Sequence, residues 1–147
     1  MWATRPGGVA IDQNNNIWVG SNTVSNAQVA QLLKLNSSGT VLATFNDSSN
    51  SLGGSIFVDG ANNIWFFVIG SPNETFLEFD SQGNHLQTFD RINSSGGPRS
   101  VALDGSGNTW MAAGSGVYQL IGLTTPVVTP IASNLVSPYT TPASKPQ

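Results

Sequence analysis

The chain has 147 residues with five basic and eight acidic side chains, and its formal net charge is −3. So few scattered basic residues lack the positive surface that a phosphate backbone requires, which argues against nucleic acid as a partner. The chain has no cysteine and therefore no disulfide or thiolate metal site, and no apolar run is long enough to span a membrane.

The composition also bears on location. Ser, Asn, Gly and Thr take the place of charged residues, a pattern common in secreted bacterial proteins. Residues 1–5 show neither the apolar region nor the cleavage site of a signal peptide. We therefore expect an extracellular or periplasmic protein whose full-length form carries an export signal outside this sequence.

Short apolar runs begin the chain and are separated by clusters of Asn, Ser and Gly. They are Val9–Ile11, Ile17–Val19, Leu32–Leu35 and Val41–Phe45. Runs of this length with turn residues between them predict β-strands, and no segment has the pattern of a helix.

The same pattern returns twice along the chain. An Asp six residues before a Trp occurs at Asp12 and Trp18, at Asp59 and Trp65, and at Asp104 and Trp110, with successive copies 47 and 45 residues apart. The second half of the unit repeats as well, since 33–39 matches 77–83, but the third copy departs after Leu120. A period in the forties with four short strands per unit indicates the blades of a β-propeller.

The sequence thus predicts an all-β fold of three four-stranded antiparallel repeats, forming a partial or open propeller in which two and a half units are complete. The blades are expected at about 5–46, 52–90 and 97–123. Residues 124–147 hold five of the eight prolines and are expected to form an extended Pro/Ser/Thr-rich tail.

The repeated Asp and Trp residues are expected to be structural. An Asp that opens a tight turn can accept backbone N–H groups two or more residues further on. The alternative is a ligand to a cation such as calcium, but one carboxylate per turn is too few for an ion that prefers six to eight oxygens. The Trp rings are expected to pack between blades, with a sugar-stacking surface as the alternative.

At these residues the chain resembles the NHL-repeat superfamily of β-propellers. The resemblance rests on Pro98–Asp104 with Gly107–Trp110, echoed by Pro6–Asp12 with Asn16–Trp18, and covers roughly residues 5–122. It implies a ring of about six blades, of which this chain has three, and it is similar in particular to secreted bacterial NHL-like proteins. The superfamily includes protein-binding and RNA-binding scaffolds, a streptogramin lyase and lactonases. The lyase branch typically has Trp-Phe-Thr-Glu after this turn, and the Glu is missing after Trp18, Trp65 and Trp110.

No catalytic, metal or cofactor site is predicted. The single histidine, His85, follows a Gly-Asn turn between outer strands, where neither an orienting partner nor a pocket is expected. Glu74, Glu78 and Asp80 form the densest acidic group, expected on a solvated outer face, with a weak cation site as the alternative.

The connection between the second and third strands is longest in the first unit and shrinks in the next two. Because insertions in repeat arrays often form the binding surface, this connection is the candidate ligand-binding loop. The residues assigned to it are Ser21, Asn22, Thr23, Ser25 and Asn26.

The leading functional hypothesis is therefore a non-enzymatic, exported scaffold that binds protein or glycan through its loop face. The alternative is part of a propeller lyase or lactonase whose catalytic residues lie on missing blades. Three blades leave a free face at each end, so a homodimer closing a six-bladed ring, or missing covalent blades, is expected to cover both.

Overall fold

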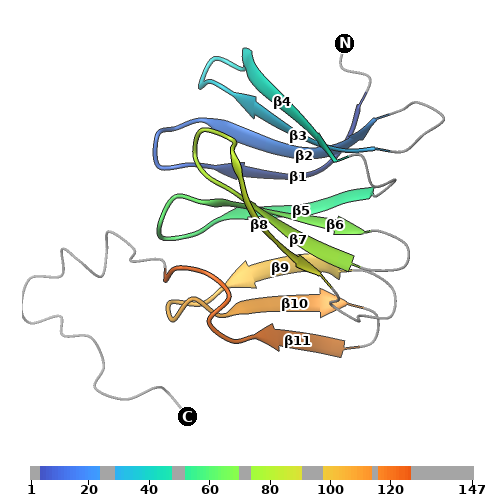
Figure 1. Ribbon diagram of the computed structural model, residues 1–147, viewed down its shortest axis with the longest axis vertical. Coiled ribbons are helices and arrows are strands. Elements are labelled where there is room, and N and C mark those ends of the chain that lie inside the picture. Colours follow the sequence, from blue (N-terminus) through green and yellow to red (C-terminus); the bar gives the residue numbers. More distant parts are fainter. Residues whose placement is uncertain are drawn as a thin grey trace, which may run out of the picture.

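The computed structural model describes residues 4–23, 29–47, 52–69, 74–90, 98–113 and 116–126. This part of the chain forms three antiparallel β-sheets and contains no helix (Figure 1). Consequently, no helix among these residues is long and apolar enough to cross a membrane.

Each sheet follows the order of the chain, so neighbouring strands are also consecutive. The first sheet consists of β1 (Thr4–Ile11), β2 (Ile17–Thr23), β3 (Ala30–Leu35) and β4 (Val41–Asp47). The second consists of β5 (Leu52–Val58), β6 (Ile64–Ile69), β7 (Glu74–Phe79) and β8 (His85–Asp90). The third consists of β9 (Pro98–Leu103), β10 (Thr109–Ala113) and β11 (Gly116–Leu120). These meanders are the predicted blades, named blades one, two and three below.

Blade three has three strands in the described residues, where four were predicted. After Leu120 the chain turns at Ile121 and Gly122, and the described residues that follow, up to 126, form no further strand beside β11. Gly122 has a φ of 63°, a left-handed conformation that glycine adopts without steric cost. The residues that follow run instead toward the turns of blades two and three.

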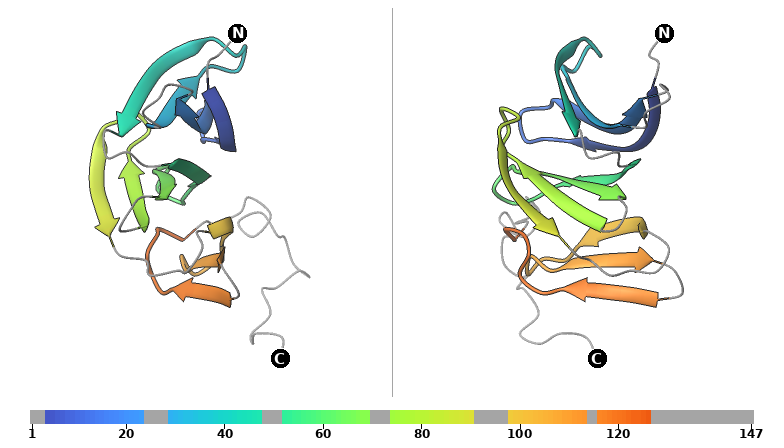
Figure 2. Two further views of the ribbon diagram at one scale, coloured as in Figure 1. Left: turned by 90° about the vertical axis from the view of Figure 1, so that its right-hand side faces the viewer. Right: turned by 45° about the vertical axis from the view of Figure 1, so that its right-hand side comes forward.

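The blades stack side by side as an arc (Figure 2). In the left view β1, β5 and β9 follow one side of the arc, and β4 and β8 follow the other. The first strand of each blade is therefore innermost, and in blades one and two the fourth strand is outermost. This is the arrangement of an open propeller, in which each sheet packs face to face against the next.

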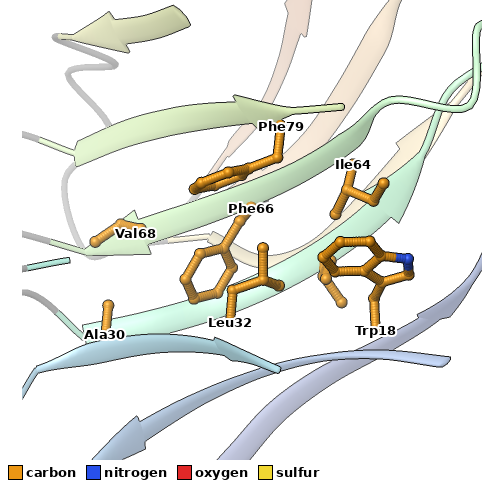
Figure 3. Close-up of a cluster of buried hydrophobic side chains, with 8 residues drawn as sticks. Trp18, Ala30, Leu32, Ile64, Phe66, Val68 and Phe79 are labelled. Atoms are coloured by element: carbon orange, nitrogen blue, oxygen red, sulfur yellow. The ribbon is translucent and has the colours of Figure 1, made fainter. Parts of the chain in front are cut away.

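Each junction between blades encloses an apolar cluster. Figure 3 shows the first cluster, where Trp18 and Leu32 of blade one lie against Ile64, Phe66 and Phe79 of blade two. The buried residues of this cluster are Trp18, Ala30, Leu32, Ile56, Ile64, Phe66, Val68 and Phe79. The second cluster, between blades two and three, contains Trp65, Phe67, Phe76, Met111 and Ala113.

Aromatic rings link the strands within these clusters. Trp65 stacks on Phe57 with a centroid distance of 6.0 Å and lies 5.4 Å from Phe89. In blade one the corresponding pair is Trp18 and Phe45, at 6.1 Å. Offset and tilted ring pairs of this kind stabilise a core beyond the area they bury.

Candidate functional site

The repeated Asp residues act on their own turns. In blade one the Oδ1 of Asp12 accepts the backbone N–H groups of Asn14 and Asn16, both at 2.8 Å. Its Oδ2 accepts the Nδ2 of Asn16 and the indole Nε1 of Trp18, both at 2.9 Å. A single carboxylate therefore closes the turn and also fixes the orientation of the Trp ring.

The other two turns repeat this geometry with one difference. In blade three Asp104 accepts the Nε1 of Trp110 at 3.0 Å and the Nδ2 of Asn108 at 2.8 Å. In blade two Asp59 accepts the Nε1 of Trp65 at 3.1 Å, but its second Oδ2 partner is the backbone N–H of Thr125 at 3.2 Å. The carboxylate oxygens of all three Asp residues thus accept hydrogen bonds from within the protein, which leaves the turns no free carboxylate with which to bind a cation.

The hydrogen bonds change the acidity of the turn carboxyls. Burial raises the pKa of Asp12, but the bonds donated by Trp18 and Asn16 outweigh it and hold the pKa below its ordinary value. The bond from Trp110, followed by that from Asn108, lowers the pKa of Asp104 far below its ordinary value. Asp80, in the outer turn of blade two, is shifted in the same direction.

These shifts predict that the protein loses stability in acid. A carboxyl with a lowered pKa in the folded state favours folding fully above its unfolded pKa and loses that contribution as the pH falls toward the folded value. We expect a melting temperature that is flat from pH 7 to 5 and falls below about pH 4. Circular dichroism melts at several pH values measure it, and Asp104→Asn should flatten the acid limb. A melting temperature unchanged down to about pH 2 would contradict the assignment.

The start of the predicted tail crosses two of these turns. Thr124 donates its N–H and its Oγ1 to the carbonyl of Gly107 in blade three, at 3.1 and 3.0 Å. Thr125 accepts the N–H of Gly60 in blade two at 3.0 Å, in addition to its bond to Asp59. We call residues 124–126 the strap. Residues 127–147 of the predicted tail lie outside the described residues.

The turns of blades one and two are joined directly. Gln13 donates its backbone N–H to the Oδ1 of Asn62 at 2.8 Å and its Nε2 to the carbonyl of Gly60 at 3.3 Å. Asn62 has a φ of 66°. With the strap, these bonds join the three inner turns along the side of the molecule seen at the left in Figure 1.

Only some of the five candidate loop residues belong to the part of the chain that the structure describes. Ser21 is fully buried in β2, and its Oγ has no partner. Asn22 is joined to Gly53 of blade two, donating Nδ2 to its carbonyl at 3.2 Å and accepting its N–H. The Thr23 side chain, Ser25 and Asn26 lie outside the described residues. Asn22 therefore makes a contact between blades one and two. The binding role of the loop stays a prediction.

Glu78 corrects the expectation of a solvated acidic face. Its side chain is only 5% exposed. It accepts the Nδ2 of Asn63 at 2.8 Å and the Nε2 of Gln87 at 2.5 Å. The equivalent Lys34 of blade one donates Nζ to the carbonyl of Ser81 at 2.6 Å and lies 5.1 Å from the centroid of the Trp18 ring. Lys34 therefore bonds to the next blade, whereas Glu78 is hydrogen-bonded to neutral side chains of its own blade.

His85 also differs from its prediction, because it has both a partner and a pocket. It is exposed, begins β8, and its Nε2 lies 2.9 Å from the Oγ1 of Thr88. A cavity of about 260 Å³ opens beside it at the outer edge of the junction between blades one and two. The cavity is lined by Leu32, Phe45, Asn46, Phe66, Leu77, Phe79, His85 and Thr88.

Residues of β3, β4, β6, β7 and β8 line the cavity, and no sequence motif indicates it. Its walls are mainly apolar, and the lining contains no carboxylate that could orient the imidazole as a base. Elsewhere in the described part of the chain, no group of three or more His, Cys, Asp or Glu side chains gathers as a metal site would require. The described residues thus offer an apolar recess without a catalytic constellation.

The comparisons with known proteins support the fold. A protein of unknown function from Bacteroides caccae aligns with 87% of this chain at a TM-score of 0.62 and 13% sequence identity. A streptogramin B lyase aligns with 86% at a TM-score of 0.59 and 18% identity. This chain covers 46% and 42% of their respective lengths, and the likeness fits a propeller-like fold. The sequence matches no protein-family model and no curated protein.

Proposed function

We propose that this chain is an exported, NHL-like propeller scaffold without catalytic activity of its own, which binds a protein or a glycan through its loop face. The observation that carries the proposal is a difference between the two ends of the strands in each blade. The repeated polar residues in the turn between the first and second strands are hydrogen-bonded to one another. The connections at the other end of the strands vary in length.

These connections change length from blade to blade. They comprise residues 24–29 between β2 and β3, 70–73 between β6 and β7, and 114–115 between β10 and β11. The strands that carry them are fixed by the two apolar clusters. A rigid frame with variable connections along one edge is how many repeat proteins build a recognition surface.

The proposal is tested on glycan and peptide arrays with the labelled, purified chain. Replacing residues 24–28 with Gly-Ser should weaken binding at least about tenfold, which corresponds to about 1.4 kcal/mol. The matched control shortens 70–73 to Gly-Ser and should leave binding within about twofold of the wild type. Absence of binding on both arrays, or equal losses in the two variants, would reject the blade-one loop as the recognition element.

The alternative is part of a lyase or lactonase whose catalytic residues belong to blades outside this chain. It is favoured by the fold shared with the streptogramin B lyase, although a likeness at 18% identity shows the fold alone. His85 borders the apolar cavity but has only Thr88 as a side-chain hydrogen-bond partner there. Turnover of a lactone or of streptogramin B by the purified chain, abolished in His85→Ala, would overturn the proposal that the chain has no catalytic activity of its own.

A further inference from the structure

The two faces of each blade have different roles in packing. We call the sheet face that bears the repeated Trp the tryptophan face, and the other face of the same sheet the opposite face. The tryptophan face of blade one is covered by the opposite face of blade two. Trp18 is fully buried there and Trp65 of blade two is 1% exposed. The opposite face of blade two supplies Ile56, Val58, Ile64, Phe66, Val68, Leu77 and Phe79 to this junction.

The tryptophan face of blade three is uncovered in the described structure. Trp110, at the position of Trp18 and Trp65, is 39% exposed. Val117 lies on the same face and is 70% exposed, and Ile121, in the turn directly after β11, is 83% exposed. No described blade follows blade three, so Trp110 lies on the free face that was expected at this end of the chain.

The opposite face of blade one carries the matching surface. By the spacing of the repeat, Val9, Ile11, Ile17 and Val19 occupy the positions of Ile56, Val58, Ile64 and Phe66. Those blade-two residues are the ones that cover Trp18. Val9 and Ile11 are each 65% exposed. One chain thus carries both halves of a blade junction, at the two ends of its arc.

We propose that a second copy of this chain docks on these faces. The tryptophan face of blade three in each copy packs against the opposite face of blade one in the other copy, so that a two-fold axis relates the two contacts. The proposal names a partner for the scaffold proposed above and rests on its propeller fold. The contact continues the junction already formed twice within the chain. Two copies supply six blades, and one chain alone covers less than half of either solved structure.

Two details prepare blade three for this contact. The Nε1 of Trp110 is held by Asp104 as those of Trp18 and Trp65 are held by Asp12 and Asp59, so the ring is already oriented as in the formed junctions. The position of Lys34 and Glu78 is taken by the neutral Gln119. Docking therefore buries no unpaired charge at this position, which would otherwise be costly.

The test measures mass by light scattering and Trp fluorescence across a concentration series of the intact chain. We expect a dimer of twice 15.4 kDa whose Trp emission shifts to the red on dissociation. Val117→Lys on one face and Val9→Glu on the other should each raise the dissociation constant at least about tenfold. An equimolar mixture of the two variants should recover the dimer, since one of its junctions pairs Lys with Glu and the other is wild type.

The matched control is Leu86→Lys, which changes a 50% exposed residue of β8 that lies on neither end face. It should dimerise like the wild type, and circular dichroism should show all variants folded. A monomer at every concentration, a dimer indifferent to both substitutions, or open head-to-tail polymers would each overturn the proposal. None of these substitutions touches residues 24–29, so loop-dependent array binding can fail or succeed independently.

Discussion

Replacing Trp65 with alanine is expected to lower the free energy of unfolding by about 3–5 kcal/mol, because a buried indole is lost and a cavity remains. The ring is 1% exposed and touches Phe57, Phe76 and Phe89. It also fills the junction with blade three, so its loss weakens two sheets at once. Urea unfolding at a fixed protein concentration measures the change.

Trp65→Phe is the matched control for this variant. Phenylalanine keeps an aromatic ring against Phe57 but cannot donate to Asp59, so its loss should be clearly smaller than that of the alanine variant. If Trp65→Ala unfolds within about 1 kcal/mol of the wild type, the ring does not hold the junction together.

The Asp12→Ala substitution is expected to lower the free energy of unfolding by about 2–4 kcal/mol, because it leaves the buried indole N–H of Trp18 and the turn amides without an acceptor. Asp12 is 3% exposed and Trp18 is fully buried, so water cannot readily replace the carboxylate. The matched control is Asp80→Ala, whose turn has the same backbone bonds but no Trp and lies at the surface. Its loss should be smaller.

A double-mutant cycle isolates the contribution of the bond between Asp12 and Trp18. In a Trp18→Phe background the indole N–H is absent, so Asp12→Ala should cost less than it does in the wild type. Additive losses in urea unfolding would show that the carboxylate acts on the turn alone.

The fold was predictable because the information that specifies it is local and repeated. The apolar runs and the turns between them recur at fixed spacing, and each Asp meets its amide partners within four residues, so sequence separation alone indicates a cap. The indole partner six residues away was within reach of the same reasoning, because the spacing from Asp to Trp is constant. The three-stranded third sheet was foreshadowed where the repeat departs after Leu120.

The candidate site was less predictable, because its contacts join different blades. Glu78 and Lys34 hold the same place in the repeat, yet Lys34 bonds to Ser81 of the next blade and Glu78 bonds to Asn63 and Gln87 of its own blade. Trp110 has the same spacing as the buried rings, and only the absence of a described blade beyond it makes it exposed. The cavity beside His85 is lined by residues of both blade one and blade two, which the spacing within one repeat does not bring together.

The strap has a consequence for the order in which the protein forms. Its bond from Thr125 to Asp59 joins residues 66 positions apart, so we expect it to form late in folding. Contacts made after the folding transition state leave the rate of folding unchanged and slow the rate of unfolding. We therefore expect the strap to slow unfolding and so prolong the lifetime of the folded arc, with little effect on the rate of folding.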